Sequence, residues 1–151
     1  MRIRIITTVL APFKVVSGGF NRELFDYLLA FIPLTRVNRY EGQQPGDIID
    51  ISIAFPFFQK WTVIIKESWG SYREYGFADR GLRMPLGIKY WQHIHRVVAR
   101  NNTSSFVIDD IEFETSAKWL DYIIYIPLLL MFYPRKLQYK WYFKKYTSTE
   151  F

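Results

Sequence analysis

Residues 88–113 read IKYWQHIHRVVARNNTSSFVIDDIEF, and this stretch decides the fold of the chain. On both sides of Asn101-Asn102, apolar and polar residues alternate, as they do in β-strands with one buried face. Asparagine tolerates the positive φ angles of tight turns, so the two asparagines indicate a hairpin. The stretch therefore predicts two long antiparallel strands, over residues 88–99 and 106–113.

Similar strand patterns recur toward the N-terminus, at residues 2–10, 37–40, 49–55, 61–69 and 75–79. One helix interrupts them: Asn21 suits its N-cap, and it ends before Pro33. Two helical segments follow the last strand, with Pro134 in the first turn of the second. Strands joined by short turns form an antiparallel sheet, and helices at its ends in sequence give an α+β fold. Curling the sheet around the C-terminal helix leaves a hollow in which a ligand can bind.

Length and composition place the chain among globular proteins. With 151 residues, half of them hydrophobic, it is expected to form a single domain over residues 1–151. It has no cysteine, which excludes disulfides, thiolate metal sites and a thiol nucleophile. A reducing cytoplasm is compatible with this, and we expect a cytoplasmic protein. A signal peptide is not expected, because residues 2–5 alternate like a strand instead of forming an apolar run.

The C-terminal region combines apolar and basic residues. The net charge is +6, and several of the positive charges lie between Arg135 and Lys145. Such a run favours a solvated helix face over a nucleic-acid site, so no nucleic acid is expected as a partner; contact with an anionic membrane surface is the alternative. The apolar segment 119–133 contains Asp121 and Pro127 and is shorter than the roughly twenty residues of a membrane span. It is therefore predicted to be buried or interfacial.

The two histidines, His93 and His95, both lie in the predicted 88–99 strand. Residues two apart on a strand point to the same face, so the two rings share a face with Trp91 and Val97. The opposite face of this strand also carries apolar residues. The sequence therefore leaves open which of its faces is buried.

Asp79 and Asp109 extend this polar group into the neighbouring strands. Buried polar groups need hydrogen-bond partners, and imidazole and carboxylate suit one another. Three interpretations remain open: a structural network within the sheet, a set of contacts that orients a ligand, or a group of acid–base catalysts or metal ligands. The apolar residues around the histidines argue against a metal, and no cofactor is expected.

Four short motifs occur in a fixed order: Phe77-Ala78-Asp79, Met84-Pro85-Leu86, Trp91-Gln92-His93-Ile94-His95 and Asp109-Asp110-Ile111-Glu112-Phe113. With this order and spacing, the chain resembles the SRPBCC (START-like, helix-grip) superfamily, and especially its small bacterial ligand-binding and cyclase-like members. The resemblance implies a curved antiparallel sheet wrapped around a long C-terminal helix. The chain departs from the pattern at Phe113, where the superfamily usually has a tyrosine hydroxyl.

The leading hypothesis is a non-enzymatic protein that binds a small hydrophobic or aromatic molecule, such as a lipid or a polyketide-like compound, between the sheet and the C-terminal helix. One alternative is a cyclase or dehydratase that uses His93 or His95 with Asp109 or Asp79. Another is a peripheral membrane protein that contacts lipid through its basic C-terminus. The ligand and the oligomeric state stay open. The residues expected to contact the ligand are Trp61, Trp69, Tyr75, Phe77, Asp79, Trp91, His93, His95 and Asp109.

Overall fold

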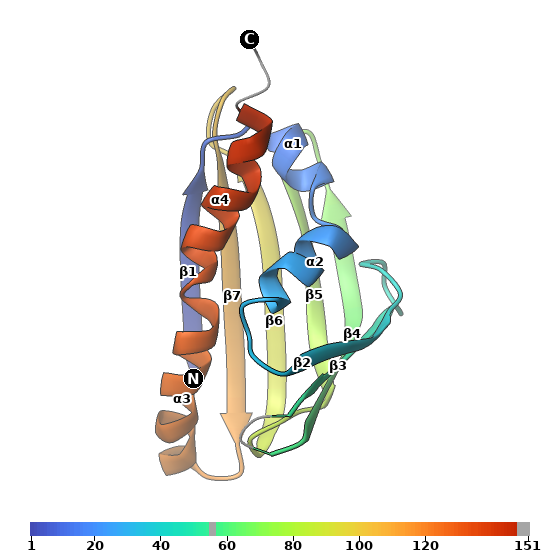
Figure 1. The fold of residues 1–151 in the computed structure, drawn as a ribbon, viewed down its shortest axis with the longest axis vertical. Helices are drawn as coiled ribbons and strands as arrows, with labels where there is room; N and C mark the ends of the chain where they lie inside the picture. The colour runs from blue at the N-terminus through green and yellow to red at the C-terminus, as the bar shows by residue number, and fades with distance from the viewer. Residues whose placement is uncertain (55–56, 148–151) are drawn as a thin grey trace.

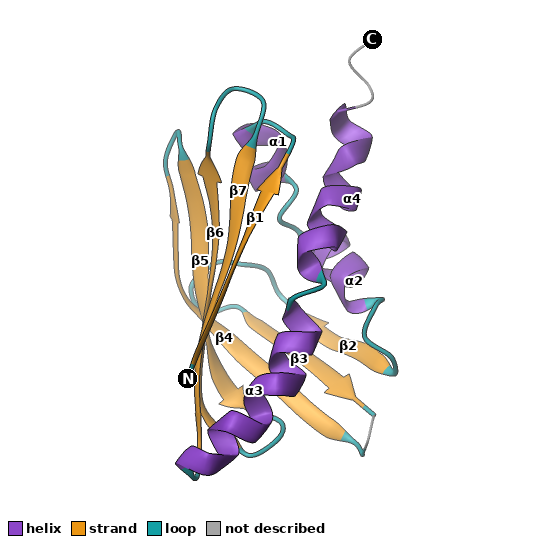
Figure 2. Ribbon diagram, turned by 90° about the vertical axis from the view of Figure 1, so that its left-hand side faces the viewer, coloured by secondary structure: helices purple, strands orange, loops and turns teal. Residues whose placement is uncertain are grey.

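A single curved antiparallel sheet of seven strands forms one side of the molecule in the computed structural model, which describes residues 1–54 and 57–147. All the helices lie on the side toward which the sheet curves (Figure 2). The strand order is β1-β7-β6-β5-β4-β3-β2, so the first and last strands of the chain are neighbours. This arrangement confirms the predicted α+β fold. The strands are β1 (Arg2–Val9), β2 (Thr35–Tyr40), β3 (Ile48–Ile53), β4 (Gln59–Gly70), β5 (Glu74–Arg83), β6 (Ile88–Ala99) and β7 (Ser105–Thr115).

The β6–β7 hairpin settles which face of β6 is buried. Trp91 pairs with Phe113 and Val97 with Val107, and all four side chains are almost fully buried. His93 lies between Trp91 and Val97 on this face and is 3% exposed. The face that carries the histidines is therefore the inner one.

Two of the β-bulges in the sheet reverse the facing that strict alternation predicts for a large apolar residue. In β4, the register shifts between Ile65 and Glu67, so that Ser68 pairs with the inward-facing Phe77 and Trp69 pairs with Gly76. The alternation had placed Trp69 on the same face as Trp61, and that prediction is wrong: Trp69 lies on the outer face. Its indole packs over Gly76 and its Nε1 donates to Oε1 of Glu74 at 3.0 Å.

The second bulge lies in β6, between Ile88 and Tyr90. Simple alternation assigns both residues to the outer face. The bulge returns Ile88 to the inside, where it is 6% exposed and belongs to the core.

Two short helices, α1 (Phe13–Gly18) and α2 (Arg22–Leu29), connect β1 to β2. The predicted cap of α2 is confirmed, because Asn21 Oδ1 accepts a hydrogen bond from the backbone amide of Leu24 at 3.2 Å. The sequence reading missed α1, which is six residues long. Both helices lie over the upper part of the sheet in Figure 1.

The C-terminal helix consists of two segments, α3 (Lys118–Phe132) and α4 (Arg135–Thr147), as expected from Pro134. Tyr133 and Pro134 join them, and the chain changes direction between the two segments (Figure 2). Both segments run along the sheet, with α4 beside β1 (Figure 1). None of the helices in the described ranges is long and apolar enough to span a bilayer.

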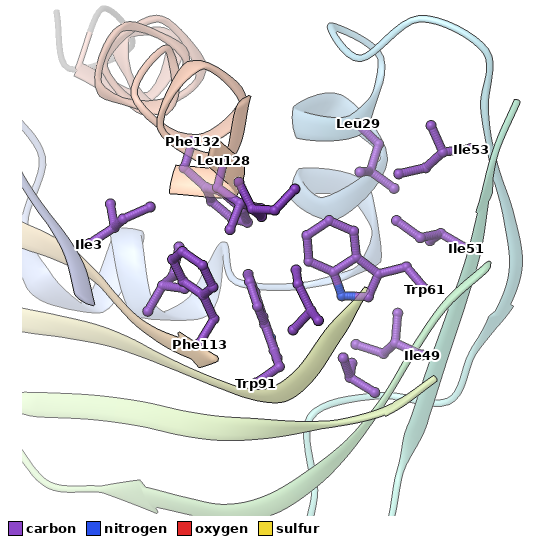
Figure 3. Close-up of a cluster of buried hydrophobic side chains, with 14 of the residues drawn as sticks. Ile3, Leu29, Ile49, Ile51, Ile53, Trp61, Trp91, Phe113, Leu128 and Phe132 are labelled. Atoms are coloured by element: carbon purple, nitrogen blue, oxygen red, sulfur yellow. The ribbon is translucent and has the colours of Figure 1, made fainter. Parts of the chain in front are cut away.

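The main core lies between α3 and the sheet. Leu128 and Phe132 point from α3 toward Trp91 and Phe113, and Trp61 projects from β4 into the same space (Figure 3). A second cluster packs α4 against α1, α2 and the other end of the sheet, around Val97, Val107, Tyr139 and Phe143. The space between these two clusters holds the candidate site.

Candidate ligand-binding site

A pocket lies between the inner face of the sheet and helices α2, α3 and α4, with a cavity volume of about 90 Å³. Its lining is predominantly apolar and comes from β2 to β6 as well as from the helices. Six of the nine residues predicted to contact a ligand line it: Trp61, Phe77, Asp79, Trp91, His93 and His95.

Aromatic rings form much of the pocket wall. The indoles of Trp61 and Trp91 meet edge to face, with centroids 4.8 Å apart. Phe132 packs against both, at 6.3 and 6.0 Å. On the other side of the histidines, Phe77 stacks on the His95 ring with centroids 4.3 Å apart. Edge-to-face and stacked contacts of this kind are favourable arrangements of aromatic rings.

The polar part of the wall is a network of two imidazoles and two carboxylates. Asp79 pairs with His93 across β5–β6, and Asp109 pairs with His95 across β6–β7. The hydrogen bonds run diagonally: Nε2 of His93 lies 2.9 Å from Oδ1 of Asp109, and Nε2 of His95 lies 3.0 Å from Oδ2 of Asp79. An ionised carboxylate only accepts, so each ring donates from Nε2. Trp91 Nε1 donates to the other oxygen of Asp79 at 3.0 Å.

Helix α4 contributes a charge that the sequence reading missed. Arg135 was grouped with the lysines of a solvated face, but it is 8% exposed, and its guanidinium lies 3.4 Å from Asp109 Oδ1. The guanidinium also covers the ring of Phe132 at 4.3 Å. The missed signal is the four-residue spacing of Arg135 and Tyr139, which places both on one side of α4.

Burial and charge determine the protonation of this network. Burial lowers the pKa of His93 to about 4, assisted by the neighbouring His95, although Asp109 acts in the opposite direction. For Asp109, burial favours the neutral acid, but the hydrogen bond from His93 and the charge of Arg135 outweigh it. Its pKa is therefore far below the usual range. At neutral pH His93 is neutral and Asp109 is ionised.

Two polar atoms of the network make no hydrogen bond among the described residues. They are the second oxygen of Asp109, Oδ2, and the hydroxyl of Tyr139, both fully buried. Burial, together with the charge of Asp109, raises the pKa of Tyr139 well above its normal value, so the phenol stays protonated. Tyr139 also lines the pocket, and its neutral hydroxyl is buried near Asp109 and Arg135.

The three remaining predicted residues lie outside the pocket lining. Asp109 faces inward but is buried beneath the histidines. Tyr75 is on the inner face beside Phe77, and its hydroxyl donates to Oε1 of the pocket residue Gln43 at 2.6 Å. Trp69 is on the outer face, as described above. The sequence reading also missed several pocket residues between positions 20 and 43. They include Phe20, Phe25, Tyr40 and Gln43.

A metal site is the remaining chemical option at these side chains. Asp79, His93 and His95 can each offer one ligand atom, and these atoms lie within 4.8 Å of one another. However, His95 Nε2 and both oxygens of Asp79 already take part in hydrogen bonds. These bonds occupy both carboxylate oxygens of Asp79.

Comparison with known proteins identifies the fold. No family model matches the sequence, and no curated protein matches it closely enough to count as a relative. Among solved structures, norcoclaurine synthase from Thalictrum flavum in complex with dopamine and hydroxybenzaldehyde has a TM-score of 0.68 at 16% identity, covering all of this chain and 88% of its own. The Zhui aromatase/cyclase from Streptomyces sp. R1128 gives 0.58 at 17%, over 78% and 69% of the two chains. Ara h 8.0201 gives 0.62 at 10%, over 94% and 96%. At these identities the likeness shows a shared helix-grip fold, and it confirms the resemblance at that level.

Proposed function

We propose that this helix-grip chain binds a small, predominantly apolar or aromatic molecule in the pocket between the sheet and its helices. The observation that carries the proposal is the composition of the wall: aromatic side chains enclose the space, and a compact polar network lies at one side of it. Ligand sites commonly combine an apolar lining with a few polar groups that fix orientation.

The polar groups of the pocket wall predict the chemistry of the ligand atoms that they contact. Tyr139 lines the pocket, and its buried phenol is protonated beside the Asp109 carboxylate. Arg135 and the two histidines line the same space. We therefore expect a ligand with an apolar or aromatic body and an oxygen or nitrogen at one end.

The cavity volume limits the size of a ligand that can bind without movement of the side chains. At about 90 Å³ it is smaller than the roughly 150 Å³ cavity that accommodates benzene in a protein core. A larger ligand must displace side chains. Met131 is suited to this because it is only half-buried, lines the pocket and has a flexible thioether side chain.

The proposal is tested by searching for the ligand and by blocking its site. Native mass spectrometry of the chain purified from its own host should reveal a co-purifying small molecule. A panel of lipids and aromatic compounds should raise the melting temperature. In Met131→Trp, the larger side chain fills the pocket, so the ligand-induced shift should disappear.

Leu130→Trp is the matched control, because Leu130 is the neighbouring residue and is 69% exposed on the outer side of α3. It should retain the ligand-induced shift. An equal shift in both variants would place binding elsewhere. The absence of both a co-purifying mass and any thermal shift would count against a binding function.

A second candidate function, a cyclase or dehydratase type of enzyme, is favoured by the pairing of each imidazole with its own carboxylate. Such pairing fixes the tautomer of a ring, and a neutral imidazole such as that of His93 can accept a proton. The test is incubation of the chain with the recovered ligand and its hydrated precursors, followed by mass analysis. The combined variant His93→Gln, His95→Gln should lose turnover much more than affinity if the chain is an enzyme. Unchanged substrate masses in the parent protein would reject this candidate.

A further inference from the structure

The side of α3 and α4 that faces away from the pocket carries large apolar side chains in contact with solvent. They form one row along both helices, which we call the outer stripe, and each is between 53% and 69% exposed. The outer stripe consists of Trp119, Tyr122, Ile123, Ile126, Leu130, Tyr133, Leu137 and Trp141.

The outer stripe lies opposite the side that packs on the sheet. In α3, Ile124, Leu128 and Phe132 are buried, and Leu130 falls between the last two, half a turn from each. Helix α3 is therefore apolar on both sides. A helix of this kind is normally buried all round or embedded in lipid, yet here one side faces water.

The charges beside the outer stripe have one sign. Lys118, Lys140 and Lys144 are exposed on α3 and α4, and the ammonium of Lys136 lies 5.6 Å from the centre of the Tyr133 ring. The one acidic residue in the sequence from 118 to 147 is Asp121, which is buried and accepts hydrogen bonds from Thr115. The apolar surface is thus bordered by lysines without exposed carboxylates on the same helices.

We propose that the outer stripe docks onto an anionic lipid bilayer, with α3 and α4 lying in the plane of the membrane interface. Interfacial helices combine an apolar face with lysines, and anionic headgroups attract such lysines electrostatically. Tryptophan and tyrosine favour the headgroup level, and the outer stripe has four of them. Neither helix is long enough to span the bilayer.

A second copy of the chain fits this face less well. Pairing two outer stripes would bring lysines of one copy toward lysines of the other, and residues 118–147 hold no carboxylate except the buried Asp121. The proposal does not depend on ligand binding. It concerns the side of α3 and α4 opposite Met131, Phe132 and Arg135, so each property can be lost without the other.

The test is co-sedimentation of the full chain with vesicles of phosphatidylcholine alone or mixed equally with phosphatidylglycerol. We expect binding to the anionic vesicles at low salt, weaker binding as salt increases, and little binding to phosphatidylcholine. The variant Ile126→Asp, Leu130→Asp should reduce binding at least tenfold. The variant Lys136→Glu, Lys140→Glu should reduce it and weaken its salt dependence.

Matched controls introduce the same charges at exposed apolar residues and lysines outside α3 and α4. Tyr72→Asp, Leu34→Asp replaces two exposed apolar residues, and Lys66→Glu, Lys89→Glu replaces two exposed lysines. Both variants should bind anionic vesicles within twofold of the parent. All variants alter exposed or half-buried side chains, and unchanged circular dichroism establishes that they are folded.

Tryptophan fluorescence locates the contact. Trp119 and Trp141 are the exposed tryptophans, so the emission should shift to shorter wavelength on vesicle binding. Trp119→Phe, Trp141→Phe should abolish this shift while the protein still sediments. No binding to anionic vesicles at low salt would overturn the proposal, as would an equal loss in the control variants. A dimer that Ile126→Asp, Leu130→Asp dissociates, without vesicle binding, would instead assign the outer stripe to self-association.

Discussion

Acidification from pH 8 to pH 5 is expected to destabilise the folded chain by about 2 kcal/mol through His93 alone. His93 is almost completely buried and is hydrogen-bonded to Asp109. The charged groups around it are Asp79 and Asp109 on the neighbouring strands and Arg135 on α4, with His95 and the Tyr139 phenol as further titratable neighbours. Burial disfavours the imidazolium despite the two carboxylates, and the pKa of His93 falls to about 4.

The sign follows from proton uptake. A histidine in the unfolded chain has a pKa of about 6.5, so it binds a proton below that pH, whereas the folded state stays neutral until about pH 4. Between these values the unfolded state binds more protons, and the free energy of unfolding falls as the pH falls. A difference of about 2.5 pKa units corresponds to about 3 kcal/mol when both states are fully protonated, of which about 2 kcal/mol is reached by pH 5.

The assay is urea unfolding followed by tryptophan fluorescence at several pH values from 8 to 5. Carboxylates with lowered pKa values, such as Glu74, stabilise the fold throughout this range and lose that contribution mainly below it, as the pH falls through the ordinary carboxyl pKa. His93→Gln retains an amide donor for Asp109 but cannot take up a proton, so its stability should vary less with pH by about 2 kcal/mol. Equal slopes in the parent and in His93→Gln would refute the assignment of this pH dependence to His93.

Three further substitutions test the packing around the site, each measured by the urea midpoint. Arg135→Met removes the guanidinium beside the buried Asp109 and should lower the free energy of unfolding by about 3 kcal/mol or more. The control, Lys136→Met, should change it by less than about 0.5 kcal/mol. Equal effects would show that the Arg135–Asp109 contact is unimportant. Leu128→Ala opens a cavity between α3 and the sheet and should cost about 2–5 kcal/mol, while Leu130→Ala, on the exposed side, should be almost neutral; a small loss at Leu128 would mean that α3 is not anchored there. Gly76→Ala would place a Cβ against the Trp69 indole and 2.8 Å from the His95 carbonyl oxygen, so the free energy of unfolding should fall by about 1–3 kcal/mol. Gly70→Ala serves as the control, because Gly70 has open space around it.

The regular parts of the fold could be predicted from sequence because their periodicity is strong. The hairpin of residues 88–113, the capped helix after Asn21 and the division of the C-terminal helix near Pro134 all follow from local patterns that tertiary contacts reinforce. The grouping of His93 and His95 with carboxylates was also predicted, because alternation on adjacent strands fixes which residues share a face.

Some residues depart from their predicted positions for physical reasons that an alternating sequence pattern does not reveal. A β-bulge adds one residue to a strand and reverses the facing of everything beyond it, which is why Trp69 is outside and Ile88 inside. Arg135 was misplaced because a basic run is normally solvated. Its burial depends on Asp109, twenty-six residues away in the chain, and only the folded structure brings the two together.

The pairing of β1 with β7 affects the order in which the strands of the sheet are expected to fold. Arg2 pairs with Glu112 and Val9 with Ser105, whereas β2 to β7 are each joined to the next strand by a local connection. Closing a long loop is entropically costly, so local hairpins are expected to form before this distant pairing. During synthesis β1 emerges first and must wait for the sheet edge that β7 provides. We expect β1 to be the first strand made and the last to be incorporated, which leaves its apolar residues without their native partners for most of translation.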